Sequence, residues 1–234
     1  MHEWLTAARD RRALIKNGAI AAAALAIPGS VSAQGPLFPL APAKGIRPTW
    51  PDAPPASLRP LTSPRVVRPE LLRRALAALD HHSSRIEHRD RIAIADFAAP
   101  SREARFHFVD LVSGRSESML VAHGSGSDPS HSGWLSRFSN EDGSNASCEG
   151  AFLAADYYVG KHGRSQRLVG LDPTNCNALA RAIVMHSAWY SNPDMIRTHG
   201  MLGRSQGCFA VGQAELERAF ALLGPGRMIY SAKV

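Results

Sequence analysis

The sequence lacks the features of several common protein classes. Its 27 basic residues are scattered and form no run, and no recognisable nucleic-acid-binding motif is present. No apolar stretch reaches the roughly 20 residues that a transmembrane helix requires. Internal repeats are absent, and cysteine occurs only three times. The first two absences argue against a nucleic-acid-binding protein and a stably membrane-spanning protein.

What remains is the composition of an ordinary globular protein. The 44% hydrophobic fraction allows a sizeable core, and 234 residues suffice for one domain or for one domain with a tail. The net charge is +7, of which the first 33 residues contribute +2. A mildly basic, scattered surface is better suited to an anionic polymer than to a specific nucleic-acid partner.

Residues 1–33 have the pattern of an export signal. Arg11-Arg12 belong to a basic segment, an Ala-rich apolar stretch follows at 18–27, and Val31-Ser32-Ala33 predicts cleavage after Ala33. The paired arginines are similar to a twin-arginine signal, and an ordinary secretory signal is about equally compatible. We therefore expect an exported mature protein without a stable membrane span.

Residues 34–69 are expected to form a proline-rich linker. They hold ten of the 16 prolines, and proline lacks a backbone donor and fixes φ, which excludes a helix or an interior strand. The domain then extends over 70–234. Its first element is predicted to be a helix at 70–82, because Pro69 suits a first turn and apolar residues recur at helical spacing.

The remaining pattern favours short strands. Strands are predicted at 91–97, 105–112, 117–123, 150–154, 182–186 and 228–231, with another apolar run starting at Cys208. Helices are predicted at 175–181, capped by Thr174, and at 213–223, and residues 124–147 read as a long loop. Strands in antiparallel succession with a few short helices predict a mainly β domain of sandwich or partial-barrel type.

A thiol and an imidazole stand at the ends of two of these apolar runs. His186 closes one run, and Cys208 opens the next after a Ser-Gln-Gly turn. Such a pair supplies the parts for nucleophilic catalysis by cysteine. The alternative is a buried core cysteine and a satisfied strand-end histidine, because free cysteine is among the most buried residue types.

The other two cysteines bear on this choice. If Cys148 and Cys176 form a disulfide, Cys208 is left as a single free thiol, as a nucleophile must be. Three reduced thiols, with Cys148 and Cys176 as small buried residues, are an equally open outcome.

At these residues the chain resembles the murein L,D-transpeptidase catalytic domain. The family signature is a strand-end His, a spacer and a Ser-x-Gly-Cys turn, here His186, residues 191–203 and Ser205-Gln206-Gly207-Cys208. The resemblance covers about 91–234 and includes short pieces at 121–127, 137–140, 160–163 and 168–172. In many members a second His stands at the position of Gln206 and an Arg follows the Cys, and both are missing here.

The resemblance implies a β-rich L,D-transpeptidase fold with the nucleophile at a strand entrance. Cys208 would be the nucleophile and His186 the base, oriented by a backbone carbonyl near Ser187, with Gly207 in a turn that faces an oxyanion. Candidate substrate-binding residues, each with a structural alternative, are Arg204, Ser205, His199, His123, Ser139 and Asn140.

The implied reaction is attack on a murein tetrapeptide stem to form a thioester, resolved by an amine of another stem. Resolution by water would make the protein an L,D-carboxypeptidase, and resolution by a lipoprotein lysine would anchor protein to murein. A catalytically degenerate murein-binding module is a further alternative. No cofactor is expected, and a zinc site of His186, His199 and Cys208 is disfavoured because short-spaced ligand pairs are absent. The expected location is the periplasm or cell envelope.

Overall fold

The computed structural model describes residues 66–234. The expected export signal, and all but the last four residues of the expected linker, lie outside this part. None of the helices within residues 66–234 combines the length and apolar character needed to cross a membrane.

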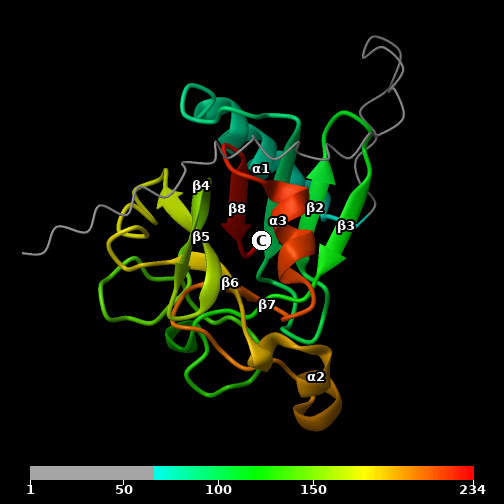
Figure 1. The fold of residues 1–234 in the computed structure, drawn as a ribbon, viewed down its shortest axis with the longest axis vertical. Coiled ribbons are helices and arrows are strands. Elements are labelled where there is room, and N and C mark those ends of the chain that lie inside the picture. The colour runs from blue at the N-terminus through cyan, green and yellow to red at the C-terminus, as the bar shows by residue number, and fades with distance from the viewer. Residues whose placement is uncertain (1–65) are drawn as a thin grey trace, which may run out of the picture. The chain divides into compact units, whose positions relative to one another are not determined.

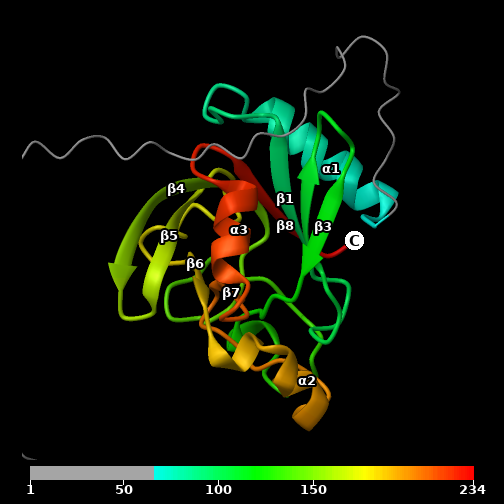
Figure 2. The same cartoon turned by 45° about the vertical axis from the view of Figure 1, so that its right-hand side comes forward.

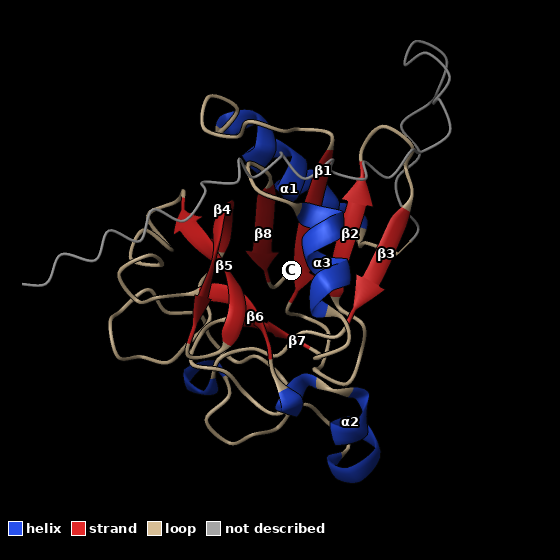
Figure 3. Cartoon of the chain, in the orientation of Figure 1, coloured by secondary structure: helices blue, strands red, loops and turns tan. Residues whose placement is uncertain are grey.

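Strands outnumber helices in the described part, as Figure 3 shows. The strands are β1 (Arg91–Asp96), β2 (Phe106–Asp110), β3 (Ser116–Met119), β4 (Gly150–Gly160), β5 (Gly163–Gly170), β6 (Val184–Ser187), β7 (Phe209–Val211) and β8 (Met228–Ala232). The α-helices are α1 (Pro69–His81), α2 (Pro193–His199) and α3 (Leu216–Leu223), and the 3₁₀ helices are η2 (Ser125–Ser127) and η3 (Trp189–Ser191). The predicted mainly β domain with short helices is confirmed.

The eight strands form one sheet in the order β3-β2-β1-β8-β4-β5-β6-β7. Most neighbours are antiparallel, but β8 runs parallel to β1 and β7 runs parallel to β6. The predicted antiparallel succession of strands is therefore wrong for β6 and β7, which follow each other in the chain and run parallel. The last strand of the chain lies between β1 and β4, in the middle of the sheet (Figure 1).

The two ends of the sheet approach each other. Beyond β3 the chain continues to Ala122, which forms an antiparallel bridge with Ala210 of β7. The Ala122 N–H donates to the Ala210 carbonyl at 2.9 Å. Because β3 and β7 are the first and last strands of the sheet order, this bridge gives the sheet the character of a partial barrel.

The two long helices lie on opposite faces of β1 (Figure 2). Alternate side chains of a strand point to opposite faces, so Ala93 and Ala95 pack with α3 while Ile92 and Ile94 pack with α1. The apolar stripe of α1 consists of Leu71, Leu72, Ala75 and Leu79, all buried. At roughly 1.5–3 kcal/mol for each buried leucine, this stripe accounts for the docking of α1.

Two stretches differ from the sequence expectations because of pairing along the β4–β5 hairpin. β4 continues to Gly160, beyond the expected 150–154, with a register irregularity between Ala154 and Tyr157. β5 was not anticipated, because residues 163–170 carry several polar side chains and little β-branched character. Its partners on both sides supply the stabilisation that its own sequence lacks.

The predicted helix at 175–181 was wrong, because consecutive turns take its place. Thr174 Oγ1 does not cap a helix and instead donates to the Glu149 carbonyl at 2.9 Å. The buried Asn175 side chain accepts from the Asp172 N–H at 2.9 Å and donates to the Ala151 carbonyl at 2.8 Å. These bonds to β4 and to the preceding turn override the local helical pattern. Conversely, α2 lies in a stretch that was expected to be loop.

Candidate active site

Cys208 and His186 are carried by two adjacent parallel strands. In the β6–β7 register Met185 pairs with Phe209 and His186 with Ala210, and Cys208 directly precedes β7. Side chains alternate along a strand, so Cys208 and His186 face the same side of the sheet while Phe209 faces the other. The sequence therefore brings the predicted nucleophile and base to one face.

Phe209 holds the start of β7 in the core. Its ring centroid lies 5.3 Å from that of Phe152 and 5.9 Å from that of Phe106, and the residue is 1% exposed. Aromatic packing of this kind contributes about 0.5–1.5 kcal/mol per pair beyond area burial. The residue beside Cys208 is thus fixed by the core, and the thiol position follows from it.

The turn before Cys208 is held by the long loop that follows β3. The Ser205 N–H donates to the His123 carbonyl at 2.9 Å, and the Ser125 N–H donates to the Ser205 carbonyl at 2.8 Å. Gly207 has a φ of +106°, and a Cβ there would lie 2.6 Å from the Ala146 carbonyl oxygen. Both the dihedral angle and the close approach require glycine.

Hydrogen bonds inside this turn engage two of the predicted site groups. The Gly207 N–H donates to Ser205 Oγ at 3.2 Å, and Ser205 Oγ donates to the Cys208 carbonyl at 2.8 Å. The Gly207 amide and the Ser205 hydroxyl are therefore used to shape the turn that presents Cys208.

Cys208 as a residue is 9% exposed, and its thiol donates to the carbonyl of Ala182 at 3.7 Å. Burial raises the pKa of Cys208, and the Val184 N–H and the positive charges of Lys161 and Arg181 oppose that rise only in part. The resting thiol is consequently protonated at neutral pH.

The His186 ring is oriented by the main chain. Its Nδ1–H donates to the Ser187 carbonyl at 2.9 Å, which leaves Nε2 as the acceptor nitrogen of the neutral ring. Burial lowers the pKa of His186, and the hydrogen bond to Ser187 offsets part of this effect. Within residues 66–234 the imidazole and the Cys208 thiol form no direct hydrogen bond, so both groups rest in their neutral forms.

Sequence reasoning assigned no role to several residues that surround this pair. His162, in the turn between β4 and β5, stacks on His186 with ring centroids 4.3 Å apart and planes at 21°. Burial raises the pKa of Tyr190 to about 12, and the nearby Cys208 adds to the rise. The stretch 160–163 belongs to the family resemblance, and this is the signal for His162 that the sequence offers.

Arg181 links the turn to the loop. It donates to the carbonyls of Ser139 at 2.8 Å and Ala146 at 2.6 Å, and to Cys148 Sγ at 2.8 Å. Its guanidinium also lies beside Gly207, where an added Cβ would come within 3.2 Å of it. Arg181 therefore supports the turn that presents the thiol and places a positive charge near Cys208.

His123 lies in a buried polar network. Arg105 only donates, so Nδ1 of His123 accepts from Arg105 Nη2 at 2.7 Å, and Nε2–H donates to Asp128 Oδ2 at 3.3 Å. Burial lowers the pKa of His123 to about 4, with a further decrease from the charge of Arg105. The neutral ring thus joins the arginine to the carboxylate beneath the long loop.

The two basic candidates near the turn differ in their surroundings. Arg204 Nη1 donates to the carbonyls of Asp128 and Pro129, the latter at 3.2 Å, so it fastens the turn to the loop. His199 is exposed at the end of α2. Across residues 66–234, no group of three or more His, Cys, Asp or Glu side chains is arranged to hold a metal ion.

Ser139 and Asn140 contact the two remaining cysteines. Cys148 Sγ donates to the Ser139 carbonyl at 3.2 Å, and Asn140 Nδ2 lies 3.2 Å from Cys176 Sγ. All three cysteines are free in the structure. The Cys148–Cys176 disulfide stays a prediction, which a thiol count on denatured, unreduced protein decides.

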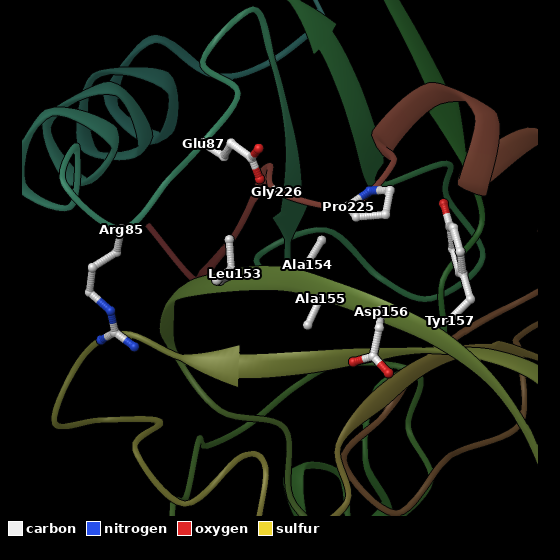
Figure 4. A pocket seen from close by; sticks show the side chains of 9 residues that line it. All are labelled: Arg85, Glu87, Leu153, Ala154, Ala155, Asp156, Tyr157, Pro225 and Gly226. Carbon is white, nitrogen blue, oxygen red and sulfur yellow. The ribbon is translucent and has the colours of Figure 1, made fainter.

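A separate hollow lies elsewhere on the domain. It has a volume of about 450 Å³ and opens over the irregular part of β4 (Figure 4). It is lined by Arg85, Glu87, Leu153, Ala154, Ala155, Asp156, Tyr157, Pro225 and Gly226. None of the predicted site residues is among them, so this hollow is separate from the Cys208 face.

Comparison with known proteins identifies the family to which the chain is similar. The family model described as L,D-transpeptidase catalytic domain matches residues 64–231. No match was found among curated proteins.

Solved structures similar to this chain include two mycobacterial proteins and one from Campylobacter. An L,D-transpeptidase from Mycobacterium smegmatis is 13% identical, with a TM-score of 0.37, over 61% of this chain and 58% of that one. An L,D-transpeptidase from Mycobacterium tuberculosis H37Rv is 12% identical, with a TM-score of 0.38, over 62% of this chain and 58% of that one. The helical cell shape determining protein Pgp2 (K307A mutant) from Campylobacter jejuni is 11% identical, with a TM-score of 0.39, over 71% of this chain and 57% of that one. The chain thus spans less than two thirds of the length of these structures.

Proposed function

The chain belongs to the L,D-transpeptidase catalytic domain family, and from this premise we propose that it is a cysteine-dependent acyltransferase acting on peptidoglycan stem peptides. One observation carries the proposal. Cys208 and His186 share a face of the β6–β7 pair, and the Ser187 carbonyl holds the His186 ring so that Nε2 is free to accept a proton. A thiol with a correctly oriented base is what nucleophilic catalysis by cysteine requires.

In the proposed first step, the Cys208 proton passes to His186 Nε2. The sulfur attacks the carbonyl between the third and fourth residues of a tetrapeptide stem, and a C–S bond forms. The C–N bond then breaks, the amine of the departing D-alanine takes the proton from His186, and a thioester remains on Cys208. Atoms and charges balance with no cofactor.

In the proposed second step, a side-chain amine of another stem attacks the thioester. The new C–N bond forms, the C–S bond breaks, and the amine proton returns through His186 to Cys208. The product is a 3→3 cross-link. The same thioester could instead be resolved by water, which gives an L,D-carboxypeptidase, or by a lipoprotein lysine, which anchors protein to murein.

The turn geometry bears on how the oxyanion would be stabilised. The Gly207 amide already donates to Ser205 Oγ, which leaves the Cys208 amide as the candidate donor from this turn. Loss of one oxyanion donor commonly lowers the rate by about 10²–10³. Lys161 and Arg181 lower the pKa of Cys208 and therefore favour the thiolate as it forms, against the opposing effect of burial.

A peptidoglycan substrate places the protein outside the cytoplasm. The export signal expected at 1–33 and the linker expected at 34–69 agree with a location in the periplasm or cell envelope. The mildly basic composition is also compatible with an anionic wall polymer. Partners on this proposal are stem peptides and, as one acceptor, an envelope lipoprotein.

The test is intact-mass measurement of the protein after incubation with a carbapenem, whose strained acyl group reports a reactive thiol. We expect one covalent adduct on wild type, none on Cys208→Ala and strongly slowed formation on His186→Ala. Cys176→Ala is the matched control, because that exposed thiol should be dispensable. If wild type forms no adduct although Cys208 reacts with a small alkylating agent, the degenerate binding module becomes the better explanation.

A further inference from the structure

The turn between β4 and β5 is built to project His162. Gly160 pairs with Gly163, so Lys161 and His162 are the two residues at the tip of the hairpin. Gly163 has a φ of +74°. Lys161 and His162 have no positive φ, so the turn is not one of the primed types common in two-residue hairpins, and Gly163 supplies the left-handed residue that follows it without strain.

Sheet register brings this tip to the candidate active site. Ser165 of β5 pairs with His186 of β6, three residues beyond the tip. The exposed His162 ring then lies on the His186 ring, which is 1% exposed, with centroids 4.3 Å apart and planes at 21°. His162 therefore covers one face of the proposed base.

The hairpin end is also braced from α3. Arg164 forms an ion pair with Glu217 of α3, and its guanidinium lies 5.2 Å from the ring centroid of Phe220 and 5.2 Å from that of Tyr157. Cation–π contacts of this kind contribute about 0.5–1 kcal/mol each at exposed sites. These contacts position the strand that carries the His162 turn relative to the core helix.

We propose that His162 is a positioning residue for the reaction proposed above: its ring lies flat on the His186 imidazole and, together with the Ser187 carbonyl, sets the plane in which His186 Nε2 meets the thiol. The inference rests on the proposed function for its catalytic consequence, although the stacking itself does not. His162 also supplies a second imidazole to a site where Gln206 stands in place of the histidine found in many family members.

The geometry restricts how His162 can act. The N–H bonds and lone pairs of an imidazole lie in the ring plane, so two stacked rings do not pass a proton directly between them. His162 acts instead by holding and shielding His186. The titratable and charged groups near the pair are Lys161 and His162 from the turn and Cys208 from the start of β7, with Arg181 and Tyr190 beside Cys208.

The electrostatic consequence has a definite sign. Burial lowers the pKa of His162, and Lys161 lowers it further, so the stacked ring is neutral near pH 7. Removal of His162 exposes His186 to water and removes an imidazole whose protonated form, populated at lower pH, opposes protonation of His186. Both changes raise the pKa of His186 and move the acidic limb of the reaction to higher pH.

The test combines an NMR titration of the His186 ring with the pH profile of carbapenem acylation. We compare wild type, His162→Ala, His162→Phe and the control His81→Ala, an exposed histidine at the end of α1. His162→Ala should raise the His186 pKa and slow acylation about tenfold to hundredfold near pH 6, as expected for a misplaced base. His162→Phe keeps a stacked ring and should recover most of the rate above pH 7.

The outcomes separate the two proposals. An unchanged His186 titration and an unchanged acylation profile in His162→Ala would overturn the positioning role. A shifted titration in a protein whose wild type forms no adduct would sustain the contact and count against the acyltransferase. If circular dichroism shows that His162→Ala does not fold, His162→Gln takes its place. The comparison of His162→Gln with His162→Phe then again sets a non-aromatic side chain against an aromatic one.

Discussion

The Cys208 sulfur lies 3.7 Å from the carbonyl oxygen of Ala182, and Ala182 adopts a left-handed φ of +52°. A residue with a Cβ pays roughly 1 kcal/mol or more for this conformation. Hydrogen bonds on either side maintain it, from the Ala182 N–H to Leu179 at 3.0 Å and from the Ile183 N–H to Ala178 at 2.9 Å. The strained peptide directs its carbonyl at the thiol.

Substitution of Ala182 by valine tests this strain. A β-branched side chain is poorly tolerated at positive φ, so Ala182→Val should destabilise the protein by about 1–3 kcal/mol although the site is exposed. Urea denaturation measures the change. Ala180→Val, in the same turn region without a positive φ, is the control and should cost less than about 1 kcal/mol. Equal costs would show that the dihedral angle at Ala182 carries no special strain.

Arg181 should affect both stability and thiol reactivity. Arg181→Met leaves the Ala146 carbonyl without a donor and the Ser139 carbonyl with only the Cys148 thiol, which should cost about 1–3 kcal/mol. Loss of its positive charge should raise the pKa of Cys208 and shift thiol alkylation to higher pH. The measurement is the pH dependence of the alkylation rate. The control is Arg73→Met, because the Arg73 side chain lies on the exposed side of α1. An unshifted profile would mean that Arg181 acts on the loop alone.

Gly207 should tolerate no side chain. In Gly207→Ala the added Cβ meets the Ala146 carbonyl at 2.6 Å at a φ of +106°, so the turn must move and carry Cys208 with it. We expect a loss of about 3 kcal/mol or more and no carbapenem adduct. Gly143→Ala has a φ of +71° but open space around its Cβ, and it should cost only about 1 kcal/mol and keep the adduct. Retention of the adduct in Gly207→Ala would contradict the geometry.

His123 should make the fold acid-sensitive. Its pKa in the folded protein is about 4, against 6.5 for an ordinary histidine, so between these values the unfolded chain binds the proton first. Stability is therefore retained above pH 6.5 and lost as the pH falls towards 4, by up to about 3 kcal/mol.

His123→Gln removes this titration while keeping an acceptor and a donor for Arg105 and Asp128. The difference in unfolding free energy between pH 7 and pH 4.5 should shrink in this variant, and urea titrations at both values measure it. The slope should not vanish, because other buried histidines such as His107 and His186 also have lowered pKa values. The same difference in wild type and variant would exclude His123 as the source.

The local sequence pattern was enough to predict those helices and strands whose own residues determine their conformation. The helix α1 follows from Pro69 and the spacing of its leucines, and β1 and β2 follow from their apolar and aromatic residues. The placement of Cys208 and His186 at the ends of adjacent strands could also be predicted from the sequence. Each of these depends on a short stretch of chain and on burial of one face.

What could not be predicted depends on partners distant in sequence. The Asn175 side chain bonds to Ala151, and this contact replaces the expected helix with turns. The stacking of His162 on His186 depends on the pairing of Ser165 with His186, which no local pattern encodes. The engagement of the Gly207 amide by Ser205 likewise follows from the turn conformation and not from residue type.

The central position of β8 also determines when the site can form during synthesis. β8 lies between β1 and β4, so the halves of the sheet that carry α1 and Cys208 are joined by a strand that is translated after the other seven strands of residues 66–234. Pairing of Ile92 with Met228 closes a chain segment of well over a hundred residues, and such long-range pairing is slow. Until Ala232 has left the ribosome, the emerging chain lacks the strand that unites its sheet, and Cys208 has no completed surroundings in which to react.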